Sequence, residues 1–230
     1  MRRALVVVGK APRPGHSKTR LAAVGSDQQV AELARAFLLD TLALALALGW
    51  EQVSLVHPAA DGPSLAALVP PAVHLVSQPR PGLGSALAHA FTHHLEQGFE
   101  RVVLIGSDTP HLSRTLLETA CAALDSHDVS LGPCADGGYY LLALKQRYAR
   151  LFEDIAWSTP RVYAQTRARA AELRLRVHTL PLWHDVDSVE DLAHLQHDLA
   201  SAPARTAPRT RAVLEQLSLV SRVRMTAVSA

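Results

Sequence analysis

Short apolar runs alternate with longer amphipathic stretches along almost the whole chain. The short runs are rich in aliphatic residues, as buried strands are, and the longer stretches have the capping residues and closing glycines of helices. We predict strands over residues 4–8, 53–57, 73–77, 102–105, 129–132, 139–144 and 176–180. We predict helices over residues 28–48, 85–97, 113–126, 160–174 and 188–199. This alternation indicates an α/β fold in which an open parallel sheet lies between layers of helices.

Polar residues that can accept a hydrogen bond from the first turn mark the start of each predicted helix. Ser188 has an acid three residues later, which is the pattern of a capping box. The other predicted caps are Ser26 or Asp27, Ser85, Ser113 and Thr159.

The length of 230 residues suits one α/β domain, which we assign to residues 1–200. The alternation ends after this point in SAPARTAP (201–208), which has the composition of a linker. We predict that residues 201–219 form a linker and a short docked helix, and that residues 220–230 form a disordered tail.

Charge and cysteine content exclude several classes of protein. The net charge is +2, but the last 30 residues hold five arginines and one acid, so the rest of the chain has a slight acidic excess. A nucleic-acid partner is therefore not expected. The two cysteines form no disulfide framework, and no apolar segment reaches the ~20 residues that span a bilayer. We expect a cytoplasmic protein without a signal peptide or a membrane span.

The loop after the first predicted strand concentrates basic side chains. In LVVVGKAPRPGHSKTR (5–20), an aliphatic run leads into two glycines, two prolines and four basic residues. A cationic, glycine-containing loop at the C-terminal end of a buried strand is typical of phosphate sites in α/β proteins. The residues that we expect to bind a nucleotide here are Gly9, Lys10, Gly15, Lys18 and Arg20.

The segment GHSKT (15–19) has part of the P-loop pattern GxxxxGK[ST]. However, Lys18 follows the second glycine by three positions instead of one, and Pro12 and Pro14 remove two backbone N–H groups that such a loop uses. A P-loop also needs a helix beginning at Lys18, whereas we expect that helix near Gln28. The strict motif fails, and a P-loop-like phosphotransferase stays as an alternative.

Asp108 follows an aliphatic strand at the edge where the ligand cleft of an α/β sheet opens. It comes three residues after the strand in VVLIGSDTPHL (102–112), and Ser107 restrains the turn that presents it. Carboxylate oxygens are the ligands that Mg²⁺ and Mn²⁺ prefer. We predict that Asp108 binds the metal and that Ser107 contacts the nucleotide. The alternative role of Asp108 is to cap the following helix, but Ser113 already fills that role.

Two more acids stand in LWHDVDSVEDL (182–192). Asp185 and Asp187 alternate along an extended segment, so we expect them to point to opposite sides, with one facing the cleft. If Asp187 approaches Asp108, a divalent cation relieves the repulsion between the two carboxylates. We predict Asp187 as the second metal ligand, with Asp185 as the alternative, and His184 as a candidate ligand or proton shuttle.

Two glycine turns complete the candidate set. Asp136 opens the turn Asp136-Gly137-Gly138 and can hydrogen-bond an acceptor hydroxyl or a donor sugar; a plain hairpin turn is the alternative. Gly84 in QPRPGLGSALAHAF (78–91) lets the backbone approach a nucleotide. For Trp157 we favour a packing role, with the lining of a pocket as the alternative.

Four motifs, in order, resemble those of a bacterial GT-A-type transferase family over residues 4–217. The motifs are KAPRPGHSKTRL (10–21), GSDTPHL (106–112), GPCADGGYYLLAL (132–144) and DVDSVEDL (185–192). Members are labelled uncharacterised glycosyltransferases or transferases associated with radical-SAM, selenium or arsenosugar loci. The family is related to the nucleotidyltransferases that guanylylate molybdopterin or phospholactate.

The resemblance implies a nucleotide-diphospho-sugar transferase fold, a three-layer α/β/α sandwich around a mixed, mainly parallel sheet. GSD (106–108) lacks the first acid of the DxD motif of many glycosyltransferases. Nucleotidyl transfer is therefore retained as a candidate reaction together with glycosyl transfer. The resemblance assigns phosphate to Lys18 and Arg20, metal to Asp108 and Asp187, and the acceptor to Asp136.

We predict a transferase that uses an NTP or a nucleotide sugar as donor, a small molecule as acceptor and Mg²⁺ or Mn²⁺ as cofactor. The predicted catalytic residues are Lys18, Arg20 and Asp136. The metal and the two basic side chains stabilise charge on the leaving group, and alignment of the acceptor supplies most of the rest. A non-catalytic nucleotide-binding domain is a further alternative, and the oligomeric state is left open.

Overall fold

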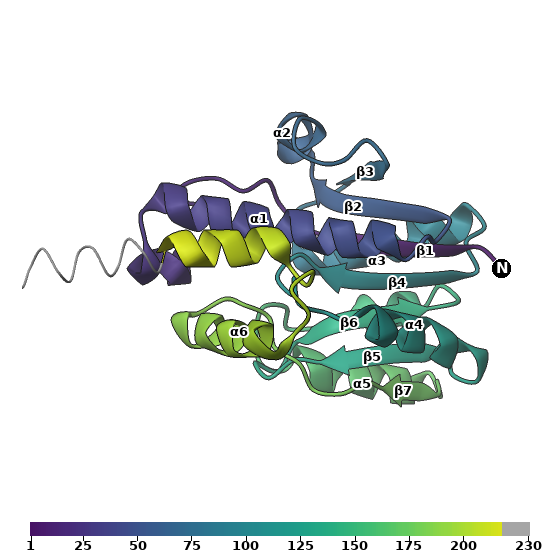
Figure 1. Ribbon diagram of the computed structural model, residues 1–230. Coiled ribbons are helices and arrows are strands. Elements are labelled where there is room, and N and C mark those ends of the chain that lie inside the picture. Colours follow the sequence, from purple (N-terminus) through teal and green to yellow (C-terminus); the bar gives the residue numbers. More distant parts are fainter. Residues whose placement is uncertain (218–230) are drawn as a thin grey trace, which may run out of the picture.

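The computed structural model describes residues 1–217 of the chain, in which one sheet of seven strands lies between helices (Figure 1). The strands are β1 (Arg3–Val8), β2 (Gln52–Pro58), β3 (Val73–Gln78), β4 (Arg101–Gly106), β5 (Val129–Pro133), β6 (Tyr139–Leu144) and β7 (Val177–Thr179). The α-helices are α1 (Asp27–Ala47), α2 (Gly62–Ala66), α3 (Leu83–Glu96), α4 (Arg114–Ala122), α5 (Val162–Glu172) and α6 (Val189–Ser201). Short 3₁₀ helices cover Thr19–Val24, Ala59–Asp61, Ala123–Asp125 and Ala149–Phe152.

The sheet is mixed and mainly parallel, as the family resemblance implies. The strand order is β3-β2-β1-β4-β6-β5-β7, and only β6 runs antiparallel to its neighbours β4 and β5. The open parallel sheet indicated by the alternation alone is therefore interrupted by one antiparallel strand. The turn around Asp136 joins β5 to β6 directly, and a connection this short cannot make the crossover that a parallel pair requires.

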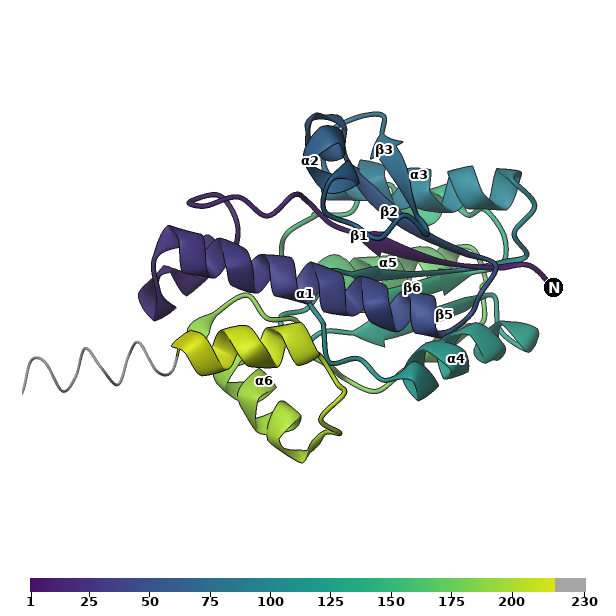
Figure 2. The same cartoon turned by 45° about the horizontal axis from the view of Figure 1, so that its top comes forward.

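Side chains of the strands alternate between two helical layers. Leu5 and Val7 of β1 join the cluster under α1 and α4, whereas Ala4 and Val6 join the cluster under α3. Figure 2 shows α1 and α4 on one side of the sheet and α3 and α5 on the other. The expected three-layer α/β/α sandwich is confirmed.

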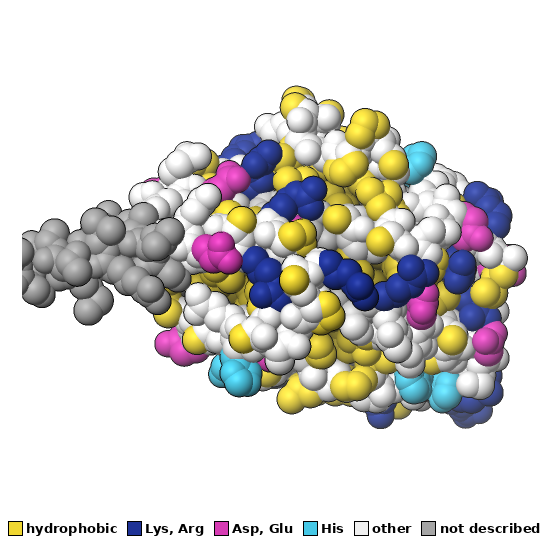
Figure 3. Space-filling model, viewed as in Figure 1, with side chains coloured by type: hydrophobic (Ala, Val, Ile, Leu, Met, Phe, Trp, Pro, Cys, Tyr) yellow, Lys and Arg dark blue, Asp and Glu magenta, His cyan; other side chains and the backbone are white. Residues whose placement is uncertain are grey.

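A third hydrophobic cluster joins the beginning of α1 to α6 and to a last helix at 208–217. Phe37, Leu195 and Leu199 belong to this cluster. The last helix lies beside α1 in both ribbon views (Figures 1 and 2). Lys and Arg side chains form a band across this face, with Asp and Glu side chains among them (Figure 3). The expected tail at 220–230, like residues 218 and 219, lies outside the described residues.

Three of the predicted helix caps are present. The hydroxyl oxygens of Ser26, Ser113 and Ser188 accept backbone N–H groups three residues later, and those of Ser26 and Ser188 form complete capping boxes.

Two of the predicted caps are wrong. α3 begins at Leu83, after Gly82 in a conformation with φ of 102°, so Ser85 lies inside the first turn instead of capping it. Thr159 donates its hydroxyl to the carbonyl of Ala156, and α5 begins at Val162. In both places the loop ahead of the helix decides where the helix starts.

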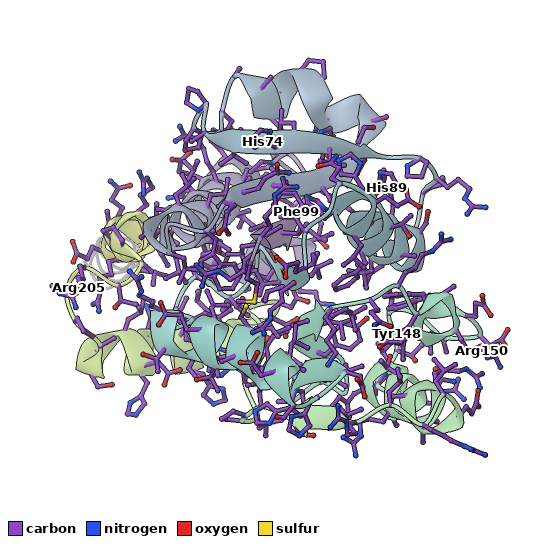
Figure 4. All side chains as sticks on the ribbon, turned by 90° about the vertical axis from the view of Figure 1, so that its right-hand side faces the viewer. His74, His89, Phe99, Tyr148, Arg150 and Arg205 are labelled. Carbon is purple, nitrogen blue, oxygen red and sulfur yellow. The ribbon has the colours of Figure 1, made fainter. Side chains whose placement is uncertain are left out.

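Within residues 1–217, no helix is both long enough and apolar enough to cross a membrane. Cys121 and Cys134 are free and buried. In the view of Figure 4, Phe99 lies in the interior, whereas Arg150 and Arg205 lie at opposite edges of the molecule.

Candidate active site

The loop that follows β1 is held in place by Asp61, a residue that the sequence analysis missed. One carboxylate oxygen of Asp61 accepts the backbone N–H of Ala11 at 2.9 Å. The other accepts a guanidinium N–H of Arg13 at 2.7 Å. Arg13 is therefore engaged in an ion pair with the protein. An acid soon after the second strand is too common a feature to have revealed this anchor.

Lys18 is the buried cation at the end of this loop. Its backbone lies in the left-handed region, with φ of 50°, and its side chain is only 8% exposed. The Nζ atom lies 2.9 Å from Oδ2 of Asp108 and 2.6 Å from Oδ1 of Asp187. Burial lowers the pKa of the Lys18 ammonium, but the charges of Asp108 and Asp187 outweigh it and hold this pKa above its ordinary value.

The two carboxylates come from segments that are far apart in the sequence. Asp108 follows β4, and Asp187 precedes Ser188, the cap of α6. The carbonyl oxygen of Asp108 accepts the N–H of Val186 at 3.0 Å, so the two segments are hydrogen-bonded beside the site. The side chains of Asp108 and Asp187 are 39% and 43% exposed, which leaves carboxylate oxygens accessible to a ligand.

A cavity of about 670 Å³ opens over the end of β1. The residues predicted for the nucleotide that line it are Gly9, Lys10, Lys18, Arg20 and Ser107, together with Asp108 and Asp187. The cavity has the size and the cationic wall expected for a nucleotide.

A second cavity of about 550 Å³ adjoins the first, because Asp108, Asp187 and Arg20 line both. The second cavity, but not the first, is lined by Asp136, Asp185 and the aromatic residues Tyr139, Tyr140 and Trp157. The structure thus brings the predicted metal ligands to the junction of two adjoining cavities. Trp157 packs against the core cluster under α3 and also lines this cavity, so both of the roles considered for it are present.

Gly15 lines neither cavity, and Gly84 lines a third one, of about 480 Å³, together with Arg80 and Trp157. A Cβ atom on Gly84 would lie 2.2 Å from the indole nitrogen of Trp157, so this glycine makes room for the tryptophan. Gly15 has φ of 71°, and a Cβ atom there would face the carboxylate of Asp27. Contact of Gly15 or Gly84 with a nucleotide stays a prediction.

The carboxylates of Asp136 and Asp185 give the second cavity an acidic wall. Asp136 accepts the N–H of Gly138 at 2.8 Å, which fixes the turn between β5 and β6. Asp185 accepts the thiol of Cys134 at 3.3 Å. Burial, together with the charges of Asp136 and Asp187, raises the pKa of Asp185 to about 6.

The expectation that Asp185 and Asp187 point to opposite sides, with one facing the cleft, is wrong, since both line the second cavity. Residues 184–187 have no regular secondary structure, so the strict alternation of a strand does not apply to them.

The segment around Lys18 differs from a P-loop. Lys18 is followed by a 3₁₀ helix over Thr19–Val24, which the sequence analysis did not foresee, and the α-helix begins only at Asp27. The Lys18 ammonium is directed at two carboxylates from distant segments. The segment from β1 to α1 therefore lacks the strand–loop–α-helix arrangement that the phosphotransferase alternative requires.

Solved structures with the same fold define the class of protein. A putative nucleotide-diphospho-sugar transferase from Desulfovibrio desulfuricans G20 matches 96% of this chain and 98% of its own, with a TM-score of 0.88 and 31% identity. Rv0371c from Mycobacterium tuberculosis H37Rv, solved in complex with manganese, matches 88% of this chain and 100% of its own, with a TM-score of 0.53 and 19% identity. The fold is that of the nucleotide-diphospho-sugar transferases and nucleotidyltransferases.

The sequence comparisons identify the family. Residues 41–159 match the family described as "Uncharacterized protein conserved in bacteria (DUF2064)". A 3-phospho-D-glycerate guanylyltransferase from Phenylobacterium zucineum (strain HLK1) is 34% identical over 181 residues, which cover 76% of this chain and 82% of that protein. The chain therefore belongs to the DUF2064 family, and the resemblance to bacterial GT-A-like transferases is confirmed. These comparisons support a nucleotidyltransferase-like enzyme.

Proposed function

We propose that this protein transfers a nucleotidyl group from an NTP to a small acceptor, with Mg²⁺ or Mn²⁺ bound by Asp108 and Asp187. The observation that carries the proposal is the convergence of Lys18, Asp108 and Asp187 where the two cavities meet. The NTP occupies the cavity over β1, and the acceptor occupies the cavity beside Asp136. The reacting atoms then meet at the junction of the two cavities.

The side chains around the junction have distinct tasks in this proposal. An acceptor oxygen attacks the α-phosphorus of the NTP, forming a new O–P bond while the bond from the α-phosphorus to the bridging oxygen breaks and pyrophosphate leaves. Lys18, Arg20 and Lys10 lie on the wall of the donor cavity and stabilise the negative charge of the departing pyrophosphate. Asp136 orients the acceptor from the second cavity.

The side chains of Asp108 and Asp187 offer ligand atoms that suit a hard divalent cation. Asp108 and Asp187 present carboxylate oxygens on the wall of both cavities, and such oxygens are preferred by Mg²⁺ and Mn²⁺. The Lys18 ammonium already shows that a cation is stabilised between these two side chains. When bound, the metal supplies Lewis-acid stabilisation of the phosphate charge.

The 34%-identical relative, which is named as a 3-phospho-D-glycerate guanylyltransferase, supports a choice of donor base and acceptor class to propose. We therefore propose GTP as the first donor to test, with a small phosphorylated carboxylic acid as acceptor. Glycosyl transfer is the second candidate, because the carboxylates in the acceptor cavity can accept hydrogen bonds from sugar hydroxyls and the ring of Trp157 can pack against a sugar ring. The products discriminate between the two, since nucleotidyl transfer releases pyrophosphate and glycosyl transfer releases a nucleoside phosphate.

The test measures pyrophosphate release and the coupled product from each NTP with 3-phospho-D-glycerate and Mg²⁺ or Mn²⁺. We expect GTP to be used, and Asp108→Asn to lower turnover by roughly 100-fold or more, as loss of a group that stabilises transition-state charge does. Asp125→Asn is the matched control, because this exposed acid pairs with Arg101 away from the site. Release of a nucleoside diphosphate from a nucleotide sugar, without pyrophosphate from any NTP, would overturn the proposal.

A further inference from the structure

A second cluster of ligating side chains lies outside the residues that line the two cavities. His111 comes from the connection between β4 and α4, His184 from the segment before α6, and Asp198 from α6 itself. Oδ2 of Asp198 lies 3.6 Å from Nε2 of His111 and 3.5 Å from Nε2 of His184. One ligand atom from each of the three residues falls within 4.8 Å of those from the other two.

The imidazole nitrogens of this cluster lack the hydrogen bonds that buried polar atoms normally make. The side chain of His111 is only 2% exposed, yet neither ring nitrogen has a hydrogen-bond partner within residues 1–217. Nε2 of His184 is likewise buried and without a hydrogen bond in this part of the chain. Buried polar groups without partners are rare in native proteins and call for an explanation, such as a bound ion.

We propose that His111, His184 and Asp198 bind a divalent transition metal of the Zn²⁺ type, at a site separate from the Asp108 and Asp187 pair. Two imidazoles and one carboxylate suit Zn²⁺, whereas Mg²⁺ prefers oxygen ligands alone. Ligand atoms about 2.0–2.1 Å from a tetrahedral Zn²⁺ lie about 3.3 Å from one another. The distances from Asp198 to the two imidazoles, 3.6 and 3.5 Å, are close to this value, and all three ligand atoms lie within 4.8 Å of one another, so modest side-chain shifts enclose the ion.

His194 can complete the coordination shell. It stands four residues before Asp198, so both side chains project from the same face of α6. Its exposed ring lies edge-on to the ring of His184, with 5.7 Å between the centroids. A rotation of His194, or a water molecule, supplies a fourth ligand.

An aromatic neighbour orients the buried imidazole. Trp183 stacks on the His111 ring at 5.1 Å between centroids and holds its orientation.

The position of the cluster gives the metal a structural role. His111 stands three residues after Asp108, and His184 stands three residues before Asp187. A shared ion would fasten the same two segments that present those carboxylates, which are otherwise joined by the hydrogen bond from Val186 to Asp108. The bound metal thereby fixes the spacing of the candidate catalytic carboxylates.

The test uses the full-length chain without a histidine tag, stripped of metal with a chelator and titrated with Zn²⁺ against a chromophoric competitor. We expect one tightly bound equivalent, and a visible absorption band when Co²⁺ replaces Zn²⁺. His111→Gln and Asp198→Asn should each weaken binding by more than the roughly 10- to 100-fold that loss of an outer-shell partner costs. Asp198 is partly exposed on α6, so Asp198→Asn keeps the test valid if His111→Gln does not fold.

Three control variants separate this site from other potential ligands. His93→Gln removes a residue of the partly buried pair His89 and His93, which is also spaced i, i+4. Cys134→Ser disrupts the cluster of Cys134, Asp136 and Asp185, and Asp108→Asn disrupts the proposed catalytic metal site. Tight binding retained in these three variants supports the proposal and does so whether or not nucleotidyl transfer is confirmed. Absence of tight binding in the parent protein, or binding that survives both His111→Gln and Asp198→Asn, overturns it.

Discussion

Lys18 and Asp187 lie 169 positions apart in the sequence, and their side chains form an ion pair with 2.6 Å between Nζ and Oδ1. The same ammonium reaches Asp108 at 2.9 Å. One lysine thus neutralises one of two negative charges in the absence of a ligand. Lys18 occupies the place where the proposed divalent metal would bind, so the lysine and the metal compete for the same carboxylates.

Lys18→Met therefore has opposite effects on metal and on nucleotide. In the absence of nucleotide, we expect Mn²⁺ to bind roughly thirtyfold tighter, because two partly exposed ion pairs worth roughly 1 kcal/mol each no longer compete. Turnover should fall by roughly 100-fold or more, because a charge that stabilises the leaving group is lost. Titration followed by the spectrum of free Mn²⁺ measures the first effect. Lys10→Met is the control, and unchanged Mn²⁺ affinity in Lys18→Met would contradict the competition.

Gly84→Ala should damage the acceptor cavity selectively. The new Cβ would lie 2.2 Å from the indole nitrogen of Trp157, so the ring, which lines the acceptor cavity, must move. We expect the KM for the acceptor to rise several-fold while the affinity for the NTP, measured by titration, changes little. In a Trp157→Ala background the same substitution has no ring to displace. An equally large effect of Gly84→Ala in both backgrounds would show that the indole is not the cause.

His94 should make the protein less stable as the pH falls from about 6.5 towards 4. The ring is fully buried; its Nδ1 faces the carbonyl oxygen of Ala90 at 2.7 Å and its Nε2 faces the hydroxyl of Ser54 at 2.8 Å. A carbonyl can only accept, so Nδ1 donates and Nε2 of the neutral ring accepts from Ser54. Burial lowers the pKa of His94 to about 4, although the hydrogen bond to Ala90 opposes this.

The sign of the effect follows from the proton balance. Between pH 6.5 and 4 the unfolded chain binds a proton at this position and the folded chain does not, so acid favours unfolding. Acidification from pH 6.5 to pH 5 lowers the free energy of unfolding by up to about 2 kcal/mol through His94. Urea unfolding at several pH values measures it. His94→Gln should be less stable at pH 7 but lose less on acidification, and an identical pH dependence in both proteins would exclude His94 as a cause.

Local rules account for the part of the site that could be predicted from the sequence. Asp108 follows an aliphatic strand and Asp187 precedes a capping box, and both patterns place a side chain at the same edge of a sheet. Lys18 stands in a loop whose charge and glycines indicate a phosphate site. These features depend on a few neighbouring residues, so the sequence displays them directly.

Features that depend on the fold could not be predicted in the same way. Ser85 has the residue type of a cap, but the turn at Gly82 starts the helix earlier. Asp61 anchors the basic loop through partners about 50 positions away. His111 and His184 have no motif spacing at all, because they meet only where two connections between sheet and helices lie side by side.

Asp40 should control whether the helix at 208–217 stays docked. Its carboxylate is fully buried on α1 and accepts the N–H of Thr210 at 2.8 Å and that of Arg209 at 3.3 Å. The Arg209 guanidinium adds an ion pair at 3.2 Å. A side chain of one helix thus caps the first turn of another, far along the chain, which explains why an acid is tolerated in the most apolar segment of the sequence.

Asp40→Ala removes this cap and leaves backbone N–H groups without a partner, so we expect a loss of about 3 kcal/mol in the free energy of unfolding. At this chain length the loss corresponds to a fall of roughly 6–12 °C in Tm. Trypsin should also cleave faster after Arg205, Arg209 and Arg211, because the undocked helix exposes them. In a chain shortened to residues 1–204 the carboxylate has lost its partners, so Asp40→Ala should there be neutral or stabilising. A loss of the same size in the short chain would mean that Asp40 acts within α1 and not through the docked helix.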